Sequence, residues 1–346
     1  MKLIFPVLTL TRGGAQRMLT ELANRLTEMG HEVTILLPSD GVVEYEMKCK
    51  LIYAQEGELA ASDFPAGDVI ISNFYTTVEV SQRASEEGKG IHVRLALCYE
   101  PTFLPDNSRS FSSYNIAPNL LVLSHWQQGI VQMNHGIKGR IVPIGVGPVF
   151  KNTKIRDRNK RLVISAIMRK PEGGFSAHRE QDYLLQQLNK VKAHHPEVEI
   201  YLISPPGEQA ESATLQALVN DERYQVRTPA NDTELCFHYS ESDIFVSSST
   251  YDTGSLPGIE AMRCGAALVT VYAGGNKEYC THGHNCLMSY RFENRLADDI
   301  ITLIRDPSLR RRLARKGEEV SQDFTWEKST RIFQNMLFEI VSRNPS

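Results

Sequence analysis

The sequence contains few cysteines and no long apolar run. Six cysteines are scattered over 346 residues, as expected of reduced thiols and not of a disulfide-stapled secreted domain. No apolar run approaches the roughly 20 residues that a membrane-spanning helix needs, and the start of the chain lacks the pattern of a signal peptide. We therefore expect a cytoplasmic protein, either free or at the inner face of the membrane.

The chain also has no large excess of positive or negative charge. The formal net charge is −3, which gives no general attraction to polyanions, so no nucleic-acid partner is expected. Two local basic runs, residues 154–161 and 305–319, leave peripheral membrane association open. A solvated linker and a solvated helix face explain such runs more simply.

A recognisable metal motif is missing as well. The stretch CTHGHNC contains zinc-ligand residue types at Cys280, His282, His284 and Cys286. Its spacing fits no finger or ribbon pattern, and alternate residues of a loop do not easily converge on one tetrahedral ion. We expect a loop between a helix and a strand here, and no metal site.

Apolar strands alternate with amphipathic helices along the chain. In residues 1–150 the strands, such as KLIFPVLTL (2–10), are apolar throughout, which is typical of strands buried on both faces. The pattern restarts after a polar, basic link and continues through residues 151–325, and an amphipathic helix follows at 326–343. This alternation predicts α/β architecture with two Rossmann-like domains, whose parallel sheets face each other across a cleft.

Glycines and cations mark several ends of the predicted strands. Gly13 and Gly14 stand between the first strand and helix, in a turn that is neither G-x-G-x-x-G nor a Walker loop, and a tight turn explains them equally well. Arg169 and Lys170 end the first strand of the second domain, a Gly-Gly turn follows, and Arg179 precedes the next helix. Cations so placed can bind a diphosphate, although ordinary surface arginines would look the same.

The stretch DTGSLPGIE (252–260) leads from a strand into a helix. Backbone N–H groups of Gly254, Ser255 and Leu256 at the start of that helix would form an anion site. Asp252 would lie at the turn, and Glu260 could accept the hydroxyls of a ribose, as acidic residues do in nucleotide-binding folds. The simpler alternative is a helix cap beside an exposed glutamate.

The same stretch carries a resemblance to a known family. Residues 252–269, D-T-G-S-L-P-G-I-E-A-M-R-C-G-A-A-L-V, resemble the signature of retaining glycosyltransferases of the GT-B fold, family 4, in which seven residues separate an acid from a Glu. Residues 12–36, 121–131 and 273–288 resemble further family segments, so that the likeness extends over nearly the whole chain. CYEPTFLP (98–105) is similar to a rhamnosyltransferase-like branch, which is a much weaker likeness.

The resemblance implies a role for each candidate residue. Arg169 and Arg179 would neutralise the diphosphate leaving group, Asp252 would contact the donor sugar, and Glu260 would hold the ribose. The candidate catalytic set is Asp252, Arg169, Arg179 and Glu100, and the candidate donor-binding set is Gly13, Gly14, Lys170, Thr253, Gly254, Ser255, Leu256 and Glu260. With these arginines and no D-x-D motif in the chain, no metal ion or other cofactor is expected.

Three departures from the family pattern bear on these roles. Asp252 stands where the family has Glu, Arg179 stands where it has Lys, and PIGVG (143–147) replaces P-N-G-V-D. The family's N-terminal sugar-contacting His has no clear counterpart. We expect Glu100, with Tyr99, to make the N-terminal polar contact instead, and packing of an acceptor loop explains both residues equally well.

The resemblance implies a metal-independent transfer of a sugar, with retention, from a UDP, GDP or dTDP donor to a hydroxyl acceptor. The acceptor would be a saccharide, a lipid-linked glycan or a small metabolite, bound by loops such as 40–65 and 100–115. The family's last helix returns to the N-terminal domain, which assigns residues 326–346 to that role. A nucleotide-sugar 2-epimerase of the same fold and a non-catalytic sugar-nucleotide-binding homologue remain as alternatives.

Overall fold

The computed structural model describes residues 1–104, 107–158, 161–172 and 176–344. The predicted Gly-Gly turn at residues 173–174, and part of the basic run 154–161, lie outside these ranges. The chain forms two compact units, one of residues Met1–Gly145 with Trp326–Ser346 and the other of Val146–Thr325. Each unit is described here by itself. No helix in the described part of the chain has both the length and the apolarity needed to cross a membrane.

The first unit is built on a seven-stranded sheet in the order β3-β2-β1-β4-β5-β6-β7, in which all neighbours run parallel. Its strands are β1 (Lys2–Pro6), β2 (Glu32–Leu37), β3 (Lys50–Tyr53), β4 (Val69–Ser72), β5 (Ile91–Leu95), β6 (Asn119–Val122) and β7 (Arg140–Ile141). Its helices are α1 (Gly14–Glu28), α2 (Tyr75–Glu86), α3 (Asn107–Ser112), α4 (His125–His135) and α12 (Trp326–Arg343).

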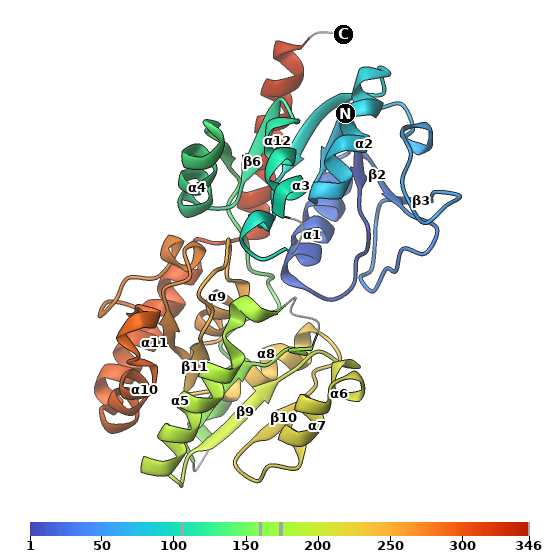
Figure 1. The fold of residues 1–346 in the computed structure, drawn as a ribbon. Helices are drawn as coiled ribbons and strands as arrows, with labels where there is room; N and C mark the ends of the chain where they lie inside the picture. The colour runs from blue at the N-terminus through green and yellow to red at the C-terminus, as the bar shows by residue number, and fades with distance from the viewer. Residues whose placement is uncertain (105–106, 159–160, 173–175, 345–346) are drawn as a thin grey trace. The chain divides into compact units, whose positions relative to one another are not determined.

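The C-terminal helix α12 completes the core of this first unit. Its buried face includes Trp326 and Phe333, and the Phe333 ring lies 6.4 Å from that of Phe5 on β1. Helix α12 also packs against α1 (Figure 1). The hydroxyl of Ser329 donates to the carbonyl of Pro143 at 2.5 Å. Residues more than 300 positions apart in the sequence thus share one core.

The second unit has a six-stranded parallel sheet in the order β10-β9-β8-β11-β12-β13. Its strands are β8 (Val163–Ile167), β9 (Glu199–Ile203), β10 (Gln225–Arg227), β11 (Ile244–Ser247), β12 (Ala267–Val271) and β13 (Cys286–Ser289). Its helices are α5 (Gln181–His194), α6 (Glu208–Glu211), α7 (Ala213–Val219), α8 (Asp232–Glu241), α9 (Leu256–Arg263), α10 (Leu296–Arg305) and α11 (Pro307–Ser321).

The two parallel sheets confirm the predicted α/β, doubly wound fold class. Helix α12 has the predicted bounds. Strand β3, in contrast, lies in the stretch 40–65, which was expected to be a loop. It is an edge strand and only partly buried. Its sequence therefore does not show the continuous apolar run that is typical of a central strand. The units divide at residues 145–146, before the predicted 150–151, because Val146 donates its N–H to the carbonyl of Phe324 inside the second unit.

Candidate functional site

A small pocket lies at the carboxyl ends of β8 and β11 in the second unit. These two strands are neighbours at the centre of the sheet, where the strand order reverses direction. Ligands of open α/β sheets bind at such a switch point. The polar residues that line the pocket are Arg179, Ser247, Ser248, Ser249, Asp252 and Ser255. The structure therefore brings together one cation and one acid of the predicted catalytic set, and Ser255 of the predicted donor-binding set.

The turn from β11 to α9 is fixed by contacts inside the unit. Asp252 donates its N–H to the carbonyl of Ala273 at 2.8 Å and accepts from the N–H of Gly275 at 2.7 Å. A Cβ atom on Gly275 would lie 2.1 Å from the carbonyl oxygen of Thr253, so only glycine permits this approach. The Tyr279 hydroxyl donates to the carbonyl of Ser255 at 2.7 Å. The turn that carries Asp252 is thus held from the β12 side.

The donor groups predicted at this turn are only in part as expected. The Ser255 N–H donates to Oδ1 of Asp252 at 3.0 Å. One of the N–H groups that were expected to bind an anionic ligand is therefore already bonded to a side chain of the same turn. Ser255 itself adopts a left-handed conformation with φ of 54°. Thr253, Gly254 and Leu256 are buried. Asp252 therefore caps its own turn as well as lining the pocket.

Arg179 enters the pocket from the segment between β8 and α5. The Ser248 hydroxyl donates to the carbonyl of Arg179 at 2.6 Å, and the N–H of Thr250 donates to the carbonyl of His178 at 3.0 Å. The arginine backbone is thus tied to the end of β11. Burial lowers the pKa of the half-buried Arg179 guanidinium, and the nearby carboxylate of Asp252 opposes this shift. An arginine remains charged under such shifts, so the pocket contains a fixed cation.

Arg169 and Lys170 lie beside this pocket, at the end of β8, and both are ion-paired. Arg169 contacts Glu208 at 2.5 Å and Lys170 contacts Glu211 at 3.0 Å. Arg169 also affects the pKa of Arg179 through its charge, which places the two arginines in one electrostatic environment. Sequence reasoning missed Glu208. The signal available for it was a carboxylate directly after the Pro-Pro-Gly turn that follows β9.

Glu260 lies on the second turn of α9 and is only 4% exposed. It is not among the described residues that line the pocket. Its role toward a ribose therefore stays a prediction.

The Gly13–Gly14 turn lies in the first unit, at the start of α1. The Gly13 N–H donates to the Tyr45 hydroxyl at 3.2 Å, and that hydroxyl lies at the same distance from the Gly13 carbonyl. The backbone at Gly13 is extended, with φ of −177°, and a Cβ atom there would meet only the side chain of Gln16. The fold itself therefore does not require glycine at position 13.

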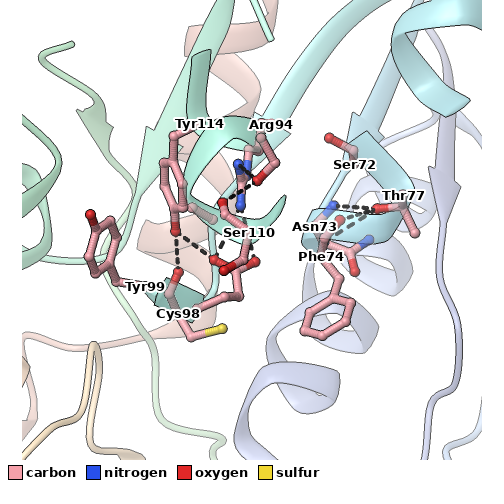
Figure 2. A network of polar contacts seen from close by, with 12 residues as sticks. Ser72, Asn73, Phe74, Thr77, Arg94, Cys98, Tyr99, Ser110 and Tyr114 are labelled. Carbon is pink, nitrogen blue, oxygen red and sulfur yellow. Dashed lines mark hydrogen bonds and ion pairs between the residues drawn. The ribbon is translucent and has the colours of Figure 1, made fainter. Parts of the chain in front are cut away.

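Glu100, predicted as a sugar contact, occupies a different environment. Its carboxylate is fully buried in an ion pair with Arg94 at 3.1 Å. The Tyr114 hydroxyl lies 2.7 Å from both Oε2 of Glu100 and the carbonyl of Cys98, and Arg94 lies over the Tyr114 ring (Figure 2). Glu100 could reach a ligand only by leaving Arg94 buried without its counter-ion, which is costly. We therefore assign it to the interior of the unit.

The four Cys and His side chains of the stretch after β12 do not all lie together. Cys280 and Cys286 are buried, whereas His282 and His284 are exposed. Nδ1 of His282 accepts a hydrogen bond from the N–H of Met288 at 3.0 Å. Over the residues that the structure describes, no group of three His, Cys, Asp or Glu side chains is arranged to hold a metal ion.

The match to a protein family lies in the second unit. Residues 173–320 match the family model of glycosyl transferases group 1. An uncharacterized glycosyltransferase of Methanocaldococcus jannaschii is 34% identical over 71 residues, which cover 20% of this chain and 20% of that protein. The match thus spans about a fifth of the relative's length.

Solved structures resemble the whole chain. Sucrose-phosphate synthase from Thermosynechococcus elongatus has a TM-score of 0.83 at 16% identity, with 99% of this chain and 100% of that chain covered. HepE from Anabaena, solved with UDP and glucose, has a TM-score of 0.79 at 20% identity, with 97% and 99% covered. At these identities the likeness is one of fold. The protein therefore has the GT-B fold, and the part of it that is similar to glycosyl transferases group 1 is residues 173–320.

Proposed function

We propose that the protein is a glycosyltransferase that moves a sugar from a nucleoside diphosphate donor to a hydroxyl acceptor. The observation that carries the proposal is the pocket at the carboxyl ends of β8 and β11, which Arg179 and Asp252 both line. A fixed guanidinium at this place matches the negative charge that develops on a departing diphosphate. The match of residues 173–320 to glycosyl transferases group 1 supports the same activity.

In the proposed reaction the bond between the sugar's anomeric carbon and the diphosphate oxygen breaks, and its electron pair goes to the diphosphate. The acceptor oxygen bonds to the same carbon from the same face, and its proton passes to an oxygen of the leaving phosphate. The anomeric configuration is then retained and no protein nucleophile is needed. Arg179 and Arg169 stabilise the departing charge, so that no metal ion is required.

Asp252 would contact the donor sugar from the turn that it caps, and Glu260 would bind the ribose. The donor nucleotide is UDP, GDP or dTDP; the structure of HepE with UDP-glucose favours testing UDP first. The acceptor is a saccharide, a lipid-linked glycan or a small hydroxyl compound.

The direct test is release of nucleoside diphosphate from UDP-, GDP- and dTDP-sugars, with and without EDTA. We expect release with one donor class, and no loss of rate with EDTA. Loss of activity in EDTA would exclude the metal-independent mechanism. Nucleotide binding without turnover of any donor would instead support the non-catalytic homologue, and formation of an isomerised nucleotide sugar would support the epimerase.

Variants of Arg179 connect the activity to the pocket. Arg179→Met should abolish most of the turnover, because it removes the cation with little change in side-chain length. Arg179→Lys is the matched control, since it keeps the charge and loses only the planar guanidinium. Equal activity in all three proteins would contradict the placement of the diphosphate at this pocket.

A further inference from the structure

The three cations next to the pocket are accompanied by three carboxylates. Arg169 is paired with Glu208 and Lys170 with Glu211, and Asp252 acts on Arg179. Formal charges therefore cancel among these six side chains. An anionic ligand does not meet an open cationic surface here, but has to compete with groups of the protein itself.

The contact between Glu208 and Arg169 is the closest of these. Oε1 of Glu208 lies 2.7 Å from Nε and 2.5 Å from an Nη atom of Arg169. Oε2 accepts the backbone N–H of Lys170 at 2.7 Å. The two side chains are only 26% and 18% exposed, so solvent screens this pair less than a surface pair.

The fold holds Glu208 in this position. Strands β8 and β9 are paired in parallel up to Ile167 and Ile203, so the segments that follow them are neighbours. Gly207, with φ of 89°, turns the chain directly before Glu208, which begins α6. The backbone of these two neighbouring segments therefore places Glu208 next to Arg169.

We infer that Glu208 competes with the ligand's diphosphate for Arg169 and thereby sets the affinity of the site for that group. The inference rests on the proposed function, in which the diphosphate binds beside Arg169. Glu208 already occupies the guanidinium edge formed by Nε and Nη. A phosphate must either displace it or bind next to it, and both arrangements weaken binding. When the diphosphate departs, Glu208 returns to Arg169 and favours release of the product.

The test is calorimetric titration with inorganic pyrophosphate and with UDP, in EDTA and at low ionic strength. Glu208→Gln keeps the side-chain shape and removes the charge, and should tighten both dissociation constants about fivefold, the order expected of one well-formed ion pair. Glu211→Gln is the matched control, because it removes the same charge from the same helix without a contact to Arg169, and because Glu211 is 68% exposed, so that solvent screens its pair with Lys170. It should change both constants less than about twofold.

A double-mutant cycle separates competition from a general charge effect. In an Arg169→Gln background, Glu208→Gln should no longer tighten binding, because the contested cation is absent. Unchanged or weaker binding by Glu208→Gln would overturn the inference, and so would an equal gain in the Arg169→Gln background. Circular dichroism checks that each variant is folded.

The outcomes also separate this inference from the proposed function. Tighter pyrophosphate binding by Glu208→Gln, in a protein that turns over no nucleotide sugar, would support the inference and refute the activity. Turnover of a nucleotide sugar with no effect of Glu208→Gln would do the reverse. If neither the wild type nor Glu208→Gln bound pyrophosphate or UDP, both would be refuted.

Discussion

The two units place an arginine and an acid close together in different ways. In the first unit, Arg94 on β5 and Glu100 after it form an ion pair whose side chains are both 0% exposed. In the second unit, Arg179 and Asp252 line a pocket. The two side chains of the first pair contact each other in the interior of the protein, whereas those of the second line a small pocket.

Burial, and not residue type, therefore distinguishes the ion pair of the first unit from the two residues that we propose to bind the donor. Arg94 bonds to Ser113 as well as to Glu100, and it lies over the Tyr114 ring. Such a network fixes the segment after β5, and we expect it to act on stability. The Arg179 pocket should act on binding and catalysis with little effect on stability.

The largest expected effect comes from breaking the buried pair. Arg94→Met leaves the Glu100 carboxylate buried without its cation and should lower the free energy of unfolding by about 3–5 kcal/mol. Both tryptophans of the chain, Trp126 and Trp326, belong to the first unit. Tryptophan fluorescence during urea unfolding therefore reports this loss directly.

The double variant Arg94→Met/Glu100→Met is the control for this first prediction. It removes both charges, so it should recover a large part of the lost stability. A single variant as stable as the wild type would show that the pair contributes nothing, and would remove the contrast between the two units.

The second effect tests the pocket in the other unit. Arg179→Met should lower kcat/KM for the accepted donor about 100-fold, the effect of removing one preorganised charge-stabilising group. Its unfolding free energy should change by less than about 1 kcal/mol. A stability loss as large as that of Arg94→Met, with binding of UDP unaffected, would make Arg179 a second structural arginine.

The sequence predicts the fold of both units, but not which carboxylates are already paired with other groups of the protein. Continuous apolar runs and helical spacing are enough to predict the two parallel sheets and the bounds of α12. The sequence also predicts that Arg179 and Asp252 lie near one ligand, because both were expected in segments that lead from a strand into a helix, and both line the pocket. Local patterns of this kind depend only on neighbours along the chain.

Glu100 and Glu208 show what the sequence cannot supply. Glu100 looks like an available polar residue, because its partners Arg94 and Tyr114 are 6 and 14 positions away and nothing local marks their convergence. Glu208 is 39 positions from Arg169, and the two meet only because β8 and β9 are neighbours in the sheet. Whether a carboxylate is saturated depends on such tertiary contacts.

The third effect concerns the polar interior of the first unit at acid pH. His92 is fully buried, with its ring nitrogens near Ser72 and Gln82. Burial, and secondly the charge of Arg94, lower its pKa to about 3. Because the unfolded chain takes up a proton near pH 6.5 and the folded unit does not, stability is retained above pH 6.5 and falls as the pH drops toward 3.

His92→Gln should therefore lessen the acid loss of stability by about 2 kcal/mol between pH 7 and pH 4.5. Urea unfolding followed by tryptophan fluorescence at both pH values measures this. His194, an exposed residue of the second unit, supplies the control variant His194→Gln, which should leave the pH dependence unchanged. An identical acid loss in His92→Gln and the wild type would refute the assignment.

The smallest effect separates the two roles of Asp252. Asp252→Asn keeps an Oδ1 atom that can accept the Ser255 N–H, but removes the charge beside Arg179. We expect kcat to fall about tenfold, since the carboxylate is proposed to contact the sugar, and UDP binding to tighten about twofold. Asp252→Ala loses the cap as well and should weaken UDP binding. If Asp252→Asn matched the wild type in kcat while Asp252→Ala lost both kcat and UDP binding, Asp252 would act only as a cap of the turn. Arg179 would then be the one of these two residues that acts on the ligand.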